Sequence, residues 1–175
     1  MSVIAQAGAK GRQLHKFGGS SLADVKCYLR VAGIMADYSQ PDDMMVVSAA
    51  GSTTNQLISW LKLSQTDRLS AHQVQQALRR YQSELISGLL PPEVADGLIG
   101  AFIHDLERLA GLLDSGVNDA VYAEVVGHGE VWSARLMSAV LNQQGLESAW
   151  LDARDFLRAE RGAQPQVDEG LSYPL

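Results

Sequence analysis

The sequence predicts an α/β fold: a parallel-sheet sandwich with helices on both faces and a helical-hairpin insertion. Two short strand candidates, 13–17 and 44–48, each run into a loop of small residues and then into a helical pattern. Strand-loop-helix units that repeat in this way are typical of βαβ folds with parallel sheets. Two long leucine-rich stripes follow at 70–90 and 91–113, and their spacing indicates two packed helices.

The first unit lies in the segment HKFGGSSLAD, residues 15–24. The strand 13–17 stops at two glycines. Ser21 to Asp24 fit a capping box, which predicts a helix from there to about Tyr38. In the second unit, a turn at Pro41 precedes the strand 44–48, the loop SAAGSTTN and a helix at 55–63.

The two leucine-rich stripes predict an antiparallel helical pair. The first has Ser70 as its expected N-cap, and the second begins at Pro91-Pro92 and ends at Gly116. Such stripes are far more often packing surfaces than functional sites. We therefore interpret about 70–115 as a helical insertion that covers one side of the sheet.

The sequence predicts shorter elements in the rest of the chain. We expect a helix at 117–126, an interruption at Gly127-His128-Gly129, a second helix at 130–144 and a third strand at 148–151. The predicted organisation is a flexible arm at 1–12, one domain at 13–158 and an irregular tail at 159–175, where the domain is cut short.

Composition excludes several classes of protein. The 175 residues are 46% hydrophobic and 19% charged, as in ordinary globular domains. The net charge of -6 is spread along the chain, which argues against nucleic-acid binding. The sequence has one cysteine and no apolar run near the ~18 residues of a membrane span. We expect a cytoplasmic protein with no nucleic-acid or membrane partner.

The first loop has the chemistry of an anion site. Gly18 and Gly19 let the backbone approach an anion closely, Ser20 and Ser21 add hydroxyl donors, and Lys16 adds a positive charge. At a helix start, free N–H groups and the helix dipole also favour an anion. A tight turn beside a solvated lysine is the alternative. The pattern matches neither the P-loop nor the dinucleotide fingerprint.

Further candidates lie downstream. Ser48 and the loop after it follow the second strand, so both loops should face one crevice. Thr54 and Asn55 could equally cap the next helix. Glu130 is expected in a first helical turn, where the dipole favours a carboxylate, and a functional role would need a cationic partner such as a substrate amino group. His128 fits a structural role better than catalysis, and no metal site is predicted.

Four segments together resemble one family. KFGGSS, VVSAAGSTTN, GHGEVWSARLMSAVLNQQG and WLDAR occur in the order and contexts of the aspartate kinases of the amino acid kinase superfamily. The sequence of these segments is most similar to that of the bifunctional members, which are fused to a homoserine dehydrogenase. The likeness runs from Gln13 to about Arg158, and it implies the amino-terminal, amino-acid-substrate lobe of such a kinase.

The resemblance implies that ATP phosphorylates the side-chain carboxylate of L-aspartate to 4-phospho-L-aspartate, the first step toward lysine, threonine and methionine. Its expected cofactors are ATP with Mg²⁺, and NADP only where the dehydrogenase part is attached. A homo-oligomer is expected. The implied roles are catalysis for Lys16, phosphate and ATP binding for Lys16, Gly18, Gly19 and Ser20, and aspartate binding for Ser48, Thr54 and Glu130.

The family also carries a downstream glycine-rich segment with an arginine, of the kind GRGGSD, and a nucleotide-binding half. Neither occurs before Leu175, so we expect an amino-terminal piece that is inactive alone. Two alternatives stay open. One is another amino acid or carbamate kinase of the superfamily, and the other is a non-catalytic anion-binding or assembly module.

Overall fold

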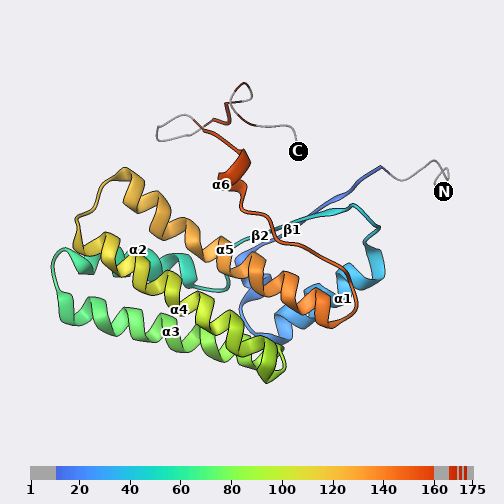
Figure 1. The fold of residues 1–175 in the computed structure, drawn as a ribbon, viewed down its shortest axis with the longest axis horizontal. Coiled ribbons are helices and arrows are strands. Elements are labelled where there is room, and N and C mark those ends of the chain that lie inside the picture. The colour runs from blue at the N-terminus through green and yellow to red at the C-terminus, as the bar shows by residue number, and fades with distance from the viewer. Residues whose placement is uncertain (1–10, 160–165, 169, 171, 173–175) are drawn as a thin grey trace, which may run out of the picture.

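The computed structural model describes residues 11–159, 166–168, 170 and 172. Residues 1–10 of the predicted arm at 1–12, and most of the predicted tail at 159–175, lie outside the described residues. Figure 1 shows the order of the elements, which are β1 (Leu14–Phe17), η1 (Gly19–Leu22), α1 (Val25–Tyr38), β2 (Met44–Val47), α2 (Thr53–Ser64), α3 (Arg68–Leu89), α4 (Pro92–Asp114), α5 (Asp119–Gln143) and α6 (Ala153–Phe156).

The sheet confirms the predicted βαβ unit. β1 and β2 pair in parallel, from Leu14 opposite Met44 to Phe17 opposite Val47, and α1 connects them. Alternate residues of each strand point to opposite faces. Phe17 and Val47 pack against the hydrophobic core, whereas Leu14 and Met44 are exposed.

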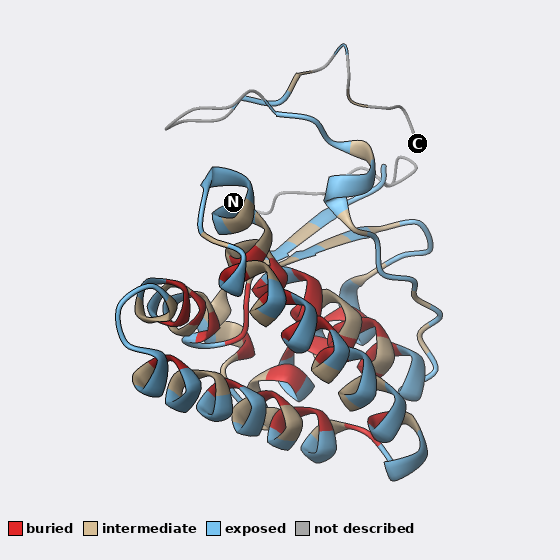
Figure 2. Cartoon of the chain, turned by 60° about the vertical axis from the view of Figure 1, so that its left-hand side comes forward, coloured by how far each residue is buried: buried red, intermediate tan, exposed pale blue. Residues whose placement is uncertain are grey.

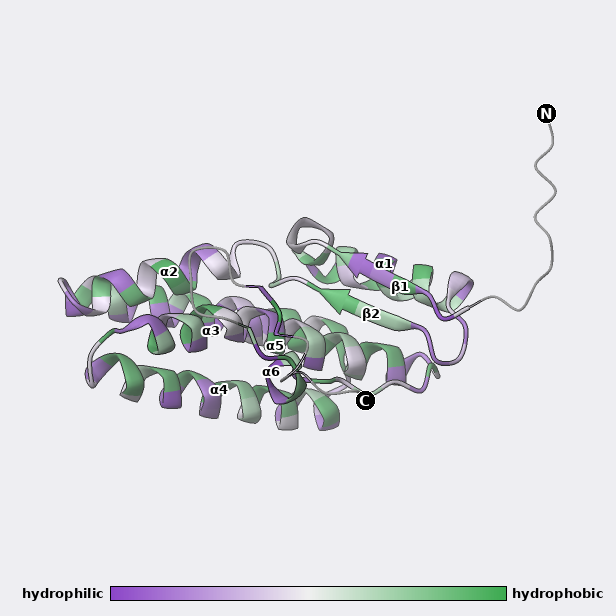
Figure 3. Cartoon of the chain, turned by 90° about the horizontal axis from the view of Figure 1, so that it is seen from above, coloured by the Kyte–Doolittle hydropathy of each residue, from purple (hydrophilic) through white to green (hydrophobic). Residues whose placement is uncertain are grey.

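Four helices build most of the core. α2 packs against α3 and α5, and α4 packs against α3 and α5. α2, α3 and α4 lie toward one side of the molecule and the sheet with α1 toward the other, and α5 runs between them and contacts both α1 and β2 (Figures 1 and 3). Figure 2 shows the buried residues on the sides where the helices face one another. The largest fully buried apolar side chains are Tyr28, Leu22, Leu57, Leu78, Leu109, Leu136 and Met137.

The hairpin of α3 and α4 is antiparallel, as predicted, but its place differs from the expectation. The end of α4 at Leu113 lies beside Gln65, just before α3 begins. α3 packs on α2 and α1, and α4 on α5, so the hairpin covers helices instead of the sheet. The reason is that its leucine-rich stripes meet the apolar sides of α2 and α5.

The expected interruption at 127–129 is wrong, because α5 is one continuous helix through Gly127, His128 and Gly129. A glycine inside a helix costs only about 1 kcal/mol relative to alanine. Packing outweighs this cost, since His128 and Gly129 are both buried. Glu130 is therefore in the middle of a helix, and the argument from the helix dipole does not apply to it.

The predicted third strand at 148–151 is not formed. Ser148 is tied to α5 instead: its N–H donates to Asn142 Oδ1 at 3.0 Å, and its carbonyl oxygen accepts from Asn142 Nδ2 at 2.8 Å. Trp150 lies under the guanidinium of Arg135, 4.6 Å from ring centroid to Cζ. Side-chain contacts with α5 thus satisfy a segment whose composition suggested a strand.

Three expected helix caps also differ. Asp24 caps α1 by accepting from Cys27 N at 2.7 Å, so Ser21 is not the cap. Asp67 caps α3 in place of Ser70. α2 already begins at Thr53, so Thr54 caps nothing. In the first two cases a carboxylate near the helix start serves as the acceptor in place of the serine hydroxyl.

Candidate functional site

Two loops and one helix meet at the carboxyl ends of the strands. We call residues 18–23, 48–53 and 129–130 the loop junction. Ser48 N donates to Phe17 O at 3.0 Å, and Gly51 N donates to Gly19 O at 2.9 Å. A Cβ on Gly19 would lie only 2.5 Å from Ala49 O, so glycine is required for this approach. The two loops are therefore in direct backbone contact.

Helix α5 closes the third side of the loop junction. A Cβ on Gly129 would stand 2.7 Å from Ala49 Cβ and 3.3 Å from Thr53 Cγ2. The absence of a side chain at Gly129 lets α5 lie directly on the second loop. This contact brings the helix residue next to it, Glu130, to the same region as the two loops.

The expected ligand-binding residues occupy distinct positions there. Lys16 is exposed on β1, opposite Val46, and Ser20 is exposed in η1. Ser48 and Thr54 are half-buried, and Glu130 is exposed on α5. Neither Lys16 nor Glu130 forms an ion pair with any residue that the structure describes. Both charges are thus available to a ligand.

The first loop differs from the expected start of a long helix. Gly18 precedes η1, a single turn of 3₁₀ helix at 19–22, and α1 begins only after Asp24. The dipole of α1 therefore does not start at Gly18-Gly19. The backbone N–H groups of the tight turn, the serine hydroxyls and Lys16 are the features that suit an anion.

Sequence reasoning missed three residues at the loop junction. Thr53 is fully buried, and Gln82 from α3 donates to its hydroxyl oxygen at 3.0 Å. The Tyr81 hydroxyl donates to Ala23 O at 2.9 Å. Tyr81 stands at helical spacing to Leu78 and Leu85, a pattern that predicts an apolar packing position. The only signal in the sequence is the polar residue Gln82 directly after Tyr81, and this signal is weak.

His128 belongs to a polar cluster beside the loop junction, where it forms hydrogen bonds within the protein. Its Nδ1 donates to Glu124 O at 2.6 Å, and its Nε2 lies 2.8 Å from Arg108 Nη2. Since arginine can only donate, this histidine accepts at Nε2 and is neutral. Burial lowers the pKa of His128 further. Glu124 also pairs with Arg154 at 2.9 Å, which attaches α6 to α5.

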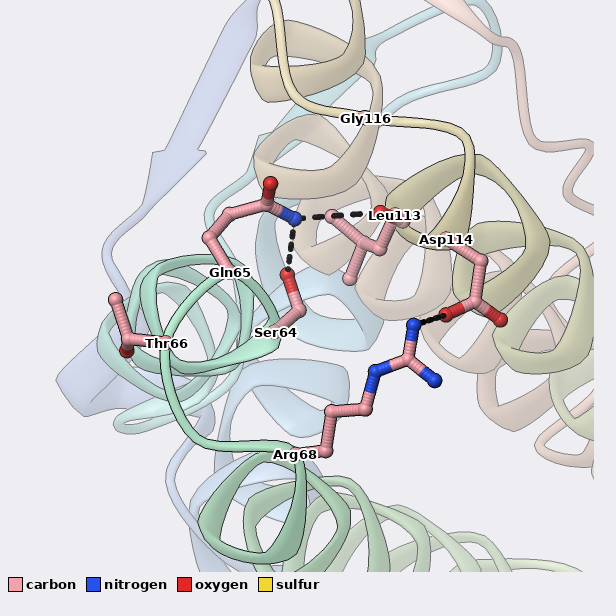
Figure 4. A pocket seen from close by; sticks show the side chains of 7 residues that line it. All are labelled: Ser64, Gln65, Thr66, Arg68, Leu113, Asp114 and Gly116. Atoms are coloured by element: carbon pink, nitrogen blue, oxygen red, sulfur yellow. Dashed lines mark hydrogen bonds and ion pairs between the residues drawn. The ribbon is translucent and has the colours of Figure 1, made fainter.

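A separate hollow of about 390 Å³ lies at the other end of α2 (Figure 4). Gln65 Nε2 donates to Leu113 O there at 3.3 Å. Arg68 and Asp114 form an ion pair at 3.8 Å, but both side chains are mostly exposed, at 86% and 75%. Such a pair is held weakly. We therefore assign no ligand to this hollow.

Two further properties concern the described residues only. They contain no group of three or more His, Cys, Asp or Glu residues placed to hold a metal ion. None of the described helices is both long enough and apolar enough to cross a membrane.

Comparison with known proteins gives close relatives. Bifunctional aspartokinase/homoserine dehydrogenase 2 of Escherichia coli is 90% identical over 175 residues, which are all of this chain and 22% of that protein. Lysine-sensitive aspartokinase 3 of E. coli is 28% identical over 144 residues, 82% of this chain and 31% of that one. The chain therefore spans less than a third of the length of either relative.

Solved structures of aspartokinases also match the fold of this chain. E. coli aspartokinase III in complex with lysine and aspartate has a TM-score of 0.79 at 23% identity, over 90% of this chain and 35% of that one. The same enzyme with aspartate and ADP gives 0.77 at 25% identity, with the same coverage. These matches confirm the expected α/β fold and the resemblance to the aspartate kinases. Residues 11–172 match the amino acid kinase family, and the chain belongs to that family.

Proposed function

We propose that this chain is the aspartate-binding, amino-terminal lobe of an aspartate kinase. Residues 13–158 form the lobe, and about 70–115 are its helical insertion. One observation carries the proposal: the two small-residue loops and the Gly129-Glu130 turn of α5 meet at one loop junction. Relatives that are aspartokinases, one of them solved with aspartate and ADP, support the choice of substrate.

The reaction transfers the γ-phosphoryl group of ATP to the side-chain carboxylate of L-aspartate. The P–O bond to ADP breaks as the bond to the carboxylate oxygen forms, and the products are ADP and 4-phospho-L-aspartate. The attacking carboxylate is already ionised at neutral pH, so the protein needs no general base. Catalysis then consists of alignment and stabilisation of charge.

Each charged residue has one role in this proposal. Lys16 stabilises the transferred phosphoryl group, and the turn of Gly18, Gly19 and Ser20 donates to it. Glu130 binds the ammonium group of aspartate, and Ser48 and Thr54 contact the same substrate. Mg²⁺ as companion of ATP, NADP in an attached dehydrogenase part, a homo-oligomer and a cytoplasmic location belong to the same proposal.

The test uses a chimaera in which this chain replaces the corresponding 175 residues of the 90% identical relative. We expect the chimaera to form 4-phospho-L-aspartate, and Lys16→Ala to lower kcat by at least ~100-fold, as loss of charge stabilisation predicts. Lys62→Ala, on the exposed side of α2, is the matched control and should not change kcat. An active Lys16→Ala variant would refute the assignment.

Two companion measurements separate the alternatives. Glutamate and carbamate replace aspartate as acceptors, and turnover of either in preference to aspartate would favour another kinase of the superfamily. A binding module would give no product with any acceptor. The 175-residue chain alone should form no 4-phospho-L-aspartate, because it spans only 22% of the active relative's length.

A further inference from the structure

Helix α3 contacts both loops of the loop junction through one tyrosine. The Tyr81 hydroxyl donates to Ala23 O, at the end of the first loop, at 2.9 Å. The same hydroxyl oxygen lies 2.8 Å from the position that a Cβ on Gly51 would take. Gly51 has a φ of 53° and is the turning point of the second loop. One hydroxyl from the hairpin thus contacts both loops.

The next residue of α3 fixes the start of α2. Gln82 Nε2 donates to Thr53 Oγ1 at 3.0 Å, and the two residues are 3% and 0% exposed. A buried hydrogen bond of this kind is costly to break, because the polar group left behind is then buried without that hydrogen-bond partner. Thr53 directly precedes Thr54, to which aspartate binding is assigned above.

A third contact sets the position of α3 along the loop junction. A Cβ on Gly88 would lie 2.6 Å from Val25 Cγ2, at the first residue of α1. The glycine lets α3 approach the point where the first loop passes into α1. α3 therefore runs past the end of the first loop, the turn of the second loop and the start of α2.

We propose that Tyr81 and Gln82 are positioning residues for phosphoryl transfer. They act through Ala23 and Thr53, and neither touches a substrate. They set the separation between the loop that holds the phosphoryl group and the helix start that holds aspartate. The inference rests on the proposed function. A displacement of about 1 Å between reacting groups can cost about 100-fold in rate, so small shifts of either loop matter.

The kinetic test uses Tyr81→Phe and Gln82→Met in the chimaera. Each change removes one hydrogen bond and keeps the shape of the side chain. We expect kcat to fall at least ~10-fold, with the KM values for aspartate and ATP within ~3-fold, because alignment and not binding is lost. Tyr122→Phe and Gln76→Met, which remove groups without a hydrogen bond to any described residue, are the matched controls.

A double variant tests whether Gln82 acts through Thr53. If it does, Gln82→Met with Thr53→Val should lower kcat no further than Gln82→Met alone. Rates are measured well below the melting temperature, with the folded fraction followed by circular dichroism. A fall in kcat that only follows the folded fraction would mean a purely structural role, and an unchanged kcat would overturn the proposal.

A measurement on the 175-residue chain separates this inference from the proposed function. The Gly51 N–H, bonded to Gly19 O, should exchange its hydrogen at least ~5-fold faster in Tyr81→Phe, while amides in the middle of α4 stay unchanged. Equal exchange would overturn the positioning role and leave the kinase assignment intact. Faster exchange in a chimaera without kinase activity would contradict the function and, with it, the catalytic meaning of these two residues.

Discussion

The two ends of α2 differ in how they are built. At the amino end, Thr53 is fully buried, and loop backbones approach so closely that glycines are required. At the carboxyl end, a hollow of about 390 Å³ is bordered by exposed charges such as Arg68 and Asp114. Open volume alone thus does not identify a functional site. Close backbone contact, with the charges of Lys16 and Glu130 beside it, is the feature on which the proposed site rests.

The largest effect should come from removing the close approach of α5. Gly129→Ala places a methyl group 2.7 Å from Ala49 Cβ, and overpacking of this kind costs about 1–3 kcal/mol. Gly127→Ala, two residues earlier on the same helix, meets nothing within 4 Å and should be neutral or stabilising. Urea unfolding of both variants measures the difference. Equal stability would mean that α5 does not rest on the second loop.

The second-largest effect concerns enzyme activity, which should respond differently to changes at the two ends of α2. Gly51 and Gly116 both have positive φ, 53° and 110°, so an alanine destabilises the chain at either position. Only Gly51→Ala should also lower kcat of the chimaera, by ~10-fold or more, since it displaces the Tyr81 hydroxyl. Steady-state kinetics decides this, and a similar loss in Gly116→Ala would remove the contrast between the ends.

A smaller effect concerns the polar cluster beside the loop junction. Burial lowers the pKa of His128 below its ordinary value of about 6.5, so below that pH the unfolded chain takes up a proton that the folded chain does not. The free energy of unfolding should therefore fall as pH decreases from 6.5, by at most about 1.4 kcal/mol per pH unit. Arg108, Arg154, Asp105 and Glu124 surround this histidine.

Two histidine variants test this dependence on pH. His128→Gln should flatten the dependence of unfolding free energy on pH between 5.5 and 7.5, whereas His104→Gln, an exposed residue on α4, should keep the slope of the unsubstituted chain. Urea titrations at several pH values measure both. A slope that His128→Gln leaves intact would assign the effect to other groups.

The smallest effect is expected at the hollow. Arg68→Ala breaks an ion pair between side chains that are 86% and 75% exposed, and should change the unfolding free energy by less than about 0.5 kcal/mol. It should also leave aspartate turnover unchanged. A loss of turnover in this variant would show that the carboxyl end of α2 takes part in the function after all.

Local patterns predicted much of the fold. The strands β1 and β2, the helical hairpin and the glycine loops all follow from periodicity and turn chemistry. The predicted interruption at Gly127-His128-Gly129 was wrong. Ala49 and Thr53 leave no room for a side chain at Gly129 of α5, but they are too far away in the sequence to be recognised as its neighbours from a local pattern. The strand at 148–151 failed similarly, since Asn142 supplies hydrogen bonds that a sheet partner would have supplied.

The candidate site shows the same division. Motif residues such as Lys16, Ser48 and Glu130 could be named from the sequence, because short loops after strands have recognisable chemistry. Tyr81 and Gln82 could not, because their partners at the loop junction are distant in the sequence: Ala23 is 58 residues from Tyr81, and Thr53 is 29 residues from Gln82. Residues that act through tertiary contact carry little local signature.

The central claim is that Glu130 binds the ammonium group of the substrate beside the loop that holds the phosphoryl group, and it has one direct test. Calorimetry on the chimaera compares the dissociation constants of L-aspartate and succinate, which lacks the amino group. A charge-assisted hydrogen bond contributes ~1.5–3 kcal/mol, so Glu130→Gln should reduce the preference for aspartate by at least ~10-fold. An unchanged ratio of the two constants would contradict the account.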